Sequence, residues 1–176
     1  TLFLSMVTWE FLSPRRALAQ SRIQRWPVNL GLASINILLI HFSVGGIAYL
    51  SAVKAAQSGW GLLNQMVLPD WLTIVVTLIV LDLAIYAQHV LMHKWPLLWR
   101  LHQVHHTDID FDATTAVRFH PLEIILSLLY KVFFIYLLGA SPIGVIAFEV
   151  ILNGAATFNH SNVKIPENID KLLRLF

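Results

Sequence analysis

Long segments without charged residues are the feature that most constrains this chain. No Asp, Glu, Lys or Arg lies between Arg25 and Lys54, and at about 1.5 Å per helical residue the segment 28–53 can cross a hydrocarbon core about 30 Å thick. The segment 71–92 carries one charge, Asp82, and predicts a second span. A soluble domain of 176 residues could not bury a composition of 57% hydrophobic and 12% charged residues. The sequence therefore predicts an integral membrane protein built from α-helices.

Two further apolar segments, 121–138 and 142–159, predict a helical hairpin, because the Gly, Ala and Ser between them suit a tight turn. Lys131 and Glu149 lie within these segments, and each would cost about 2.5 to 3.5 kcal/mol if it were alone in lipid. An antiparallel hairpin puts the two side chains at the same depth, so we expect an ion pair inside the membrane. In the alternative, Lys131 snorkels to the interface and Glu149 bonds a neighbouring helix.

The two ends of the sequence also carry apolar segments. The apolar segment 1–12 resembles the remainder of another span, so we expect one all-α membrane domain over residues 1–176 with about four to five transmembrane or membrane-embedded helices. Because the sequence starts at Thr1 without a basic leader, and the apolar pattern of 169–176 stops without a cap, we expect the chain to be incomplete at both ends.

Four arginines precede the first predicted span, namely Arg15, Arg16, Arg22 and Arg25. The positive-inside rule places this loop in the cytoplasm. Counting spans from there places the histidine-rich segment 89–106 on the same side. The net charge of +2 is otherwise scattered along the chain, which excludes a nucleic-acid partner.

The reactive side chains of this sequence are its histidines. His89 and His93 are four residues apart and share a helix face, and His102, His105 and His106 repeat this arrangement nine residues later. Neutral imidazoles bind iron, zinc, copper or nickel, and the chain has no cysteine to offer as a thiolate ligand. One such group alone is typical of interfacial polar residues, but the two together indicate a site for one or two metal ions.

Further polar residues are predicted near this site. The hairpin brings His120 and His160 to matching positions at its base, where each can join the site or remain an interfacial histidine. A metal-bound imidazole also needs an acceptor for its second N–H group. Candidates are Asp82 and Tyr86, which share a helix face with the first histidine pair, and Asn159. An interhelical contact for Asp82 and a helix-cap role for Asn159 are the alternatives.

Four segments carry a resemblance to a known family: HVLMH at 89–93, LWRLHQVHH at 98–106, DFDATTAVRFHPLE at 110–123 and FNHSN at 158–162. Together they resemble the fatty acid hydroxylase superfamily and, within it, the bacterial sterol desaturase family. The resemblance implies a di-metal oxygenase of the bacterial inner membrane, with its histidine cluster on the cytoplasmic side. Such an enzyme uses two iron ions, O2 and two electrons to hydroxylate or desaturate a sterol or fatty acyl lipid.

The resemblance also implies a set of metal ligands, which here are His89, His93, His102, His105, His106, His120 and His160. A further H-x2-H-H motif of the family is absent from this sequence, and we expect it after residue 176. The expected partners are a membrane lipid substrate and a soluble or membrane-bound electron donor. Zinc is an alternative occupant of the histidine site after purification.

Two alternatives stay open. The first is a non-catalytic accessory subunit of a larger membrane complex that retains the hydroxylase-like fold. The second is haem binding between paired transmembrane histidines. The spacing of four residues argues against haem, because two axial ligands approach the iron from opposite faces.

Overall fold

The computed structural model describes residues 2–43 and 46–173, with the side chains of 40–43 excepted. Within these ranges the chain is helical, without a strand, which confirms the predicted all-α class. Pro14 and Val163 form an isolated antiparallel bridge. In chain order the elements are α1 (Leu2–Leu12), α2 (Arg22–Ser43), α3 (Ile47–Gln57), the 3-10 turn η1 (Leu63–Gln65), α4 (Asp70–Lys94), α5 (Pro96–His106), the 3-10 turn η2 (Thr115–Val117), α6 (Pro121–Leu138), α7 (Pro142–His160) and α8 (Glu167–Leu173).

Three of the described helices, α4, α6 and α7, are long and apolar enough to cross a membrane, which makes the chain an integral membrane protein. α4 packs against both α6 and α7. α4 and α7 approach closely near the start of α7, where a β-carbon on Gly144 would lie 2.8 Å from Thr77 Cβ. Small residues at such a contact let helix backbones come together where lipid provides no hydrophobic driving force.

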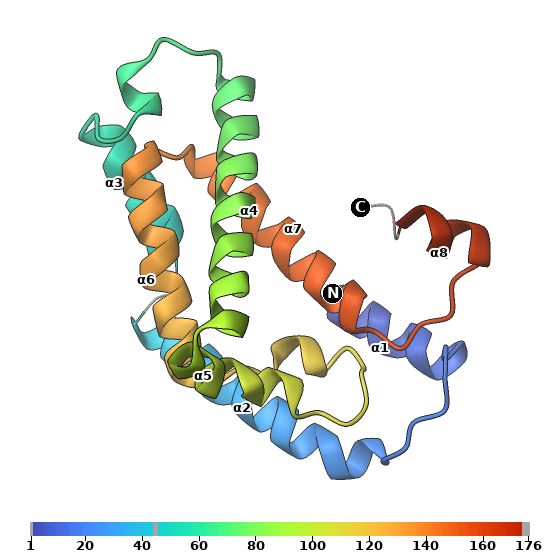
Figure 1. Cartoon of the computed structure of the whole chain (residues 1–176). Coiled ribbons are helices and arrows are strands. Elements are labelled where there is room, and N and C mark those ends of the chain that lie inside the picture. Colours follow the sequence, from blue (N-terminus) through green and yellow to red (C-terminus); the bar gives the residue numbers. More distant parts are fainter. Residues whose placement is uncertain (1, 44–45, 174–176) are drawn as a thin grey trace.

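The continuous span predicted over 28–53 is wrong. α2 ends at Ser43 and α3 begins at Ile47. Gly46, just before α3, has a left-handed φ of 81°, which residues with a β-carbon rarely adopt. Figure 1 shows α2 lying across the base of the bundle, whereas α3 rises beside α6. Both halves of the predicted segment are uncharged, so a count of charges along the sequence could not detect this change of direction.

The predicted hairpin and its ion pair are confirmed. Gly139 ends α6 with φ 69°, and the Ser141 hydroxyl caps α7 by accepting a hydrogen bond from the Gly144 amide at 3.3 Å. Lys131 Nζ donates to Glu149 Oε1 between the two helices. α6 and α7 diverge with distance from the turn that joins them (Figure 1). The ends of the hairpin opposite the turn are therefore separated, and other helices occupy the space next to them.

Candidate metal centre

A sharp turn between α4 and α5 gathers the histidines of the two helices. Trp95 is extended (φ −95°, ψ 116°), and Pro96 starts α5. A proline suits this position because the first residue of a helix needs no N–H donor inside the helix. The turn directs the last turns of α4, with His89 and His93, toward His102 on α5.

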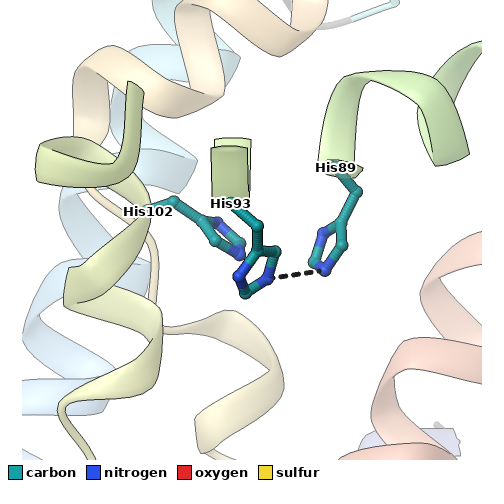
Figure 2. A group of neighbouring side chains, drawn as sticks. All are labelled: His89, His93 and His102. Carbon is teal, nitrogen blue, oxygen red and sulfur yellow. Dashed lines mark hydrogen bonds between the residues drawn. The ribbon is translucent and has the colours of Figure 1, made fainter. Parts of the chain in front are cut away.

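His89, His93 and His102 form the centre of the cluster (Figure 2). One ring nitrogen of each lies within 4.8 Å of the others. The Nε2 atoms of His89 and His93 are 3.2 Å apart. The His102 ring lies 4.7 Å from the His89 ring and 4.8 Å from the His93 ring, measured between centroids. His102 is buried, whereas the other two rings are exposed.

Three more histidines extend this cluster. His106 Nε2 lies 3.1 Å from His102 Nε2, and the His106 ring lies 4.8 Å from the ring of His93. His105 Nε2 lies 2.9 Å from Nε2 of His160, which α7 supplies. The structure therefore connects six of the seven predicted ligands, from α4, α5 and α7, into one group.

The spacing of these nitrogens fits ligands of a shared cation. Two ligand nitrogens about 2.1 Å from one ion lie roughly 3.0 to 3.4 Å apart at octahedral or tetrahedral angles. The three Nε2 pairs, at 3.2, 3.1 and 2.9 Å, are close to this range. Burial and repulsion from neighbouring histidines lower the pKa of His105 to about 3, so this ring is neutral at neutral pH, the form that binds metals. An all-imidazole donor set suits iron, zinc or copper.

Glu123 holds His102 from outside the cluster. His102 Nδ1 donates to Glu123 Oε1 at 2.7 Å, and the two residues are 1% and 4% exposed. This bond fixes the tautomer whose Nε2 lone pair faces the other histidines, an arrangement typical of metal-binding histidines. Sequence reasoning missed Glu123. The available signal was a carboxylate in the first turn of an apolar helix, where a buried charge needs a partner.

Backbone carbonyls orient two other rings. His105 Nδ1 lies 3.3 Å from the Arg118 carbonyl, and the ring stacks on Phe119 with 4.7 Å between centroids. His160 Nδ1 donates to the Ala156 carbonyl at 2.7 Å. In both residues the Nε2 atom is left to face the cluster.

Four predicted site residues do not join the cluster. The His120 side chain caps α6, with Nδ1 accepting from the Leu122 amide at 3.1 Å. Among the residues described, no hydrogen bond joins it to another histidine. Within the described residues, no hydrogen bond joins Asp82, Tyr86 or Asn159 to a histidine ring of the cluster. Asp82 and Asn159 instead line a neighbouring cavity, and Tyr86 is 67% exposed. Roles of these four at a metal stay predictions.

A cavity of about 870 Å³ lies beside the cluster, between α3, α4, α6 and α7. His89, His102, His105 and His160 line it at one end. Most of its remaining wall is apolar, including Ile85, Leu128, Val145, Ile146, Val150 and Leu152. An apolar molecule inside it would lie against the imidazoles.

A buried charge network fastens α2 to the segment that follows α5. Arg25 donates to both carboxylate oxygens of Asp108, at 2.6 and 2.8 Å, and to Asp112 at 2.9 Å. Burial alone would raise the pKa of Asp108, but hydrogen bonds from Arg25, Asn29 and Thr115 outweigh it and lower the pKa to about 2. The sequence predicts Arg25 to be one of four exposed loop arginines that determine the orientation of the chain in the membrane. It is instead buried and paired, and sequence reasoning missed this network.

Arg118 links the network to the histidines. Its guanidinium donates to Asn29 Oδ1 at 2.7 Å, to the Val104 carbonyl at 2.8 Å and to Thr107 Oγ1 at 2.8 Å. Its own carbonyl faces His105 Nδ1. The loop after α5 is thereby held against α5 itself.

Comparison with known proteins gives a family match and a curated relative. A family model described as fatty acid hydroxylase matches residues 74–175, a range that contains all six clustered histidines. Cholesterol 25-hydroxylase of Rattus norvegicus is 26% identical over 101 residues, which cover 57% of this chain and 34% of the relative. The chain thus matches about a third of that relative's length. No solved structure matches the chain.

Proposed function

Because the chain belongs to the fatty acid hydroxylase family, whose model covers more than half of it, we propose that it is a membrane lipid hydroxylase whose clustered histidines hold two iron ions. One observation carries this proposal. Nε2 atoms from three helices converge at the end of a cavity that lies between apolar helices. A lipid chain in the cavity would bring a C–H bond next to the bound metals.

The expected reaction inserts one oxygen atom of O2 into a substrate C–H bond and reduces the other to water, with two electrons and two protons. The iron ions supply the oxidising power that no side chain has. The electrons would come from a soluble or membrane-bound carrier such as a ferredoxin or a small cytochrome. The name of the rat relative supports a sterol-like substrate and hydroxylation over desaturation.

The chain's own residues position the ligands and shape the site. Glu123 and the carbonyls of Arg118 and Ala156 accept the Nδ1–H groups and thereby orient three imidazoles. The apolar cavity wall excludes water from the substrate chain. The other potential ligands, His120 and residues after 176, would complete the coordination that six histidines begin.

The test is metal and product analysis of the full-length protein in nanodiscs. We expect about two irons per chain, and an oxidised lipid when a chemical or enzymatic electron donor and O2 are supplied. His105→Ala, which removes the contact to His160, should lose both. Gln103→Ala is the matched control, because Gln103 lies on α5 but is exposed, and among the described residues its side chain bonds the Arg100 carbonyl alone.

The outcomes separate the alternatives. Two irons without any oxidised lipid would overturn the hydroxylase proposal in favour of a non-catalytic subunit. A chain without metal would overturn the metal centre. A Soret band would indicate haem, against which the Nε2 separations of 2.9 to 3.2 Å argue, since they leave no room for a porphyrin between paired rings.

The proposal includes a side of the membrane, with the histidines facing the cytoplasm of a bacterial cell. Arg15 and Arg16, between α1 and α2, and Arg22, the first residue of α2, support this orientation, because α2 lies across the base of the bundle. The chain has no cysteine, so Gln103→Cys introduces a single thiol on α5. Labelling of this thiol by an impermeant maleimide in inside-out vesicles but not in intact cells is expected. The reverse pattern would contradict the orientation.

A further inference from the structure

The part of the cavity away from the histidines has a charged wall. Lys131 and Glu149, which form the ion pair between α6 and α7, both line the cavity. The Lys131 side chain is 12% exposed and the Glu149 side chain 34% exposed. The pair therefore does more than join two helices, because both residues form part of the surface that a ligand would meet.

Asp82 adds a second carboxylate to this wall. It lies on α4, lines the same cavity, and has no hydrogen bond or ion pair within the ranges that the structure describes. A lone carboxylate inside a membrane span costs about 2.5 to 3.5 kcal/mol unless it faces water or a polar partner. A polar group of a ligand bound at this level of the cavity would lower that cost.

The charges of Asp82, Glu149 and Lys131 determine which lipid head groups the cavity can bind. A fatty acid carboxylate would meet two carboxylates, Asp82 and Glu149, and an ammonium that Glu149 already neutralises, so repulsion disfavours it. A hydroxyl group fits instead, because it can donate to Glu149 or Asp82 and accept from a second N–H group of Lys131, which has three donors.

We propose that Lys131 and Glu149, together with Asp82, bind the hydroxyl group of a neutral lipid alcohol whose apolar body extends toward the histidines. This inference rests on the proposed function and names its substrate class and specificity-determining residues. It also sets the position of oxidation. Asp82 precedes His89 by seven residues and Glu149 precedes His160 by eleven, which at 1.5 Å per residue is roughly 10 to 16 Å along the helices. The oxidised carbon should lie about this far from the hydroxyl group.

The test is equilibrium binding of three matched probes, hexadecanol, hexadecane and hexadecanoate, to the full-length metal-loaded protein in nanodiscs. We expect the wild-type protein to bind hexadecanol about tenfold more tightly than either other probe, as hydrogen bonds to charged groups imply. The double variant Lys131→Met with Glu149→Met should lose this preference while it keeps its metal content and its affinity for hexadecane.

Two further variants distinguish recognition from a structural role. The charge-exchanged variant Lys131→Glu with Glu149→Lys retains a donor and an acceptor, so it should retain the preference for the alcohol. Lys54→Met is the matched control, because Lys54 lies on α3 and does not line the cavity. It should leave the binding of all three probes unchanged.

The binding results test this inference separately from the proposed hydroxylase activity. Equal binding of the alcohol and the hydrocarbon by the wild-type protein, or tighter binding of the acid, would overturn the inference. So would a double-methionine variant that weakens all probes equally, since the pair would then be structural only. Selective binding of hexadecanol by a protein that oxidises no lipid would leave the inference standing and overturn the hydroxylase activity.

Discussion

Replacing Arg25 by alanine should destabilise the protein more than replacing Arg15, Arg16 or Arg22. Arg25 is 4% exposed, and its guanidinium satisfies the carboxylates of Asp108 and Asp112, which are 8% and 0% exposed. Removing the cation leaves two buried carboxylates uncompensated, and breaking such a buried pair costs about 3 to 5 kcal/mol. Arg15→Ala is the matched control. It removes a 3.6 Å contact to Asp170 from a side chain that is 53% exposed, which is worth at most about 1 kcal/mol.

The measurement is the free energy of unfolding in detergent, from urea titration followed by tryptophan fluorescence. Adding Asp108→Asn and Asp112→Asn to Arg25→Ala should recover part of the loss, because neutral side chains need no counter-charge. A loss for Arg25→Ala no larger than that for Arg15→Ala would refute the reasoning. So would a triple variant less stable than the single variant.

Three other predictions concern the site, the packing and the pH dependence of the fold. Glu123→Gln should lower iron affinity about 10- to 100-fold in competition with a chelator, and unchanged affinity would mean that His102 does not need this carboxylate. Gly61→Ala should lower the melting temperature, because its β-carbon would lie 2.0 Å from the Gly139 amide nitrogen at φ +91°. Gly31→Ala, with open space around it inside α2, should instead stabilise by about 0.5 to 1 kcal/mol. The pKa of Asp108, about 2 in the folded protein against an ordinary 3.8, means that its stabilisation is complete above about pH 4 and is lost as the pH falls toward 2. Asp108→Asn should abolish that slope, and a slope that persists would assign it to another carboxylate.

Local spacing allowed the core of the site to be predicted from sequence. The four-residue intervals between His89 and His93 and between His102 and His106 place each pair on one helix face, and both pairs have adjacent Nε2 atoms in the structure. The hairpin symmetry predicted the Lys131–Glu149 pair, because two positions equally far from the turn lie at the same depth and these two side chains are long enough to meet between α6 and α7. The ring of His120, at the other end of α6, caps its own helix, and a role for it at a metal stays a prediction.

Contacts between segments that are distant in the sequence could not be predicted from local patterns. Arg25 and Asp108 are 83 residues apart, and an arginine near an apolar segment has the same sequence signature whether it faces water or a buried carboxylate. His102 and Glu123 are 21 residues apart on helices whose relative placement depends on the loop between them. The break in the predicted span at Gly46 was hidden for a different reason, since a glycine is also tolerated within membrane helices.

His105 is the residue at which the membrane-embedded and peripheral parts of the structure meet. Its Nε2 atom faces His160 from a membrane-spanning helix, and its ring lines the cavity. Its Nδ1 atom faces the carbonyl of Arg118, whose guanidinium is bonded to Asn29, and Asn29 in turn donates to Asp108 at 2.8 Å. Arg25 thus reaches the cluster through a chain of hydrogen bonds. The bonds from Arg25 to Asp108, from Asn29 to Asp108 and from Arg118 to Asn29 are charge-assisted and 2.6 to 2.8 Å long, whereas the last contact, between His105 Nδ1 and the Arg118 carbonyl, is 3.3 Å long. A change at Arg25 that spares the fold should therefore disturb the orientation of His105 before that of His89, whose nearest contacts are other histidines.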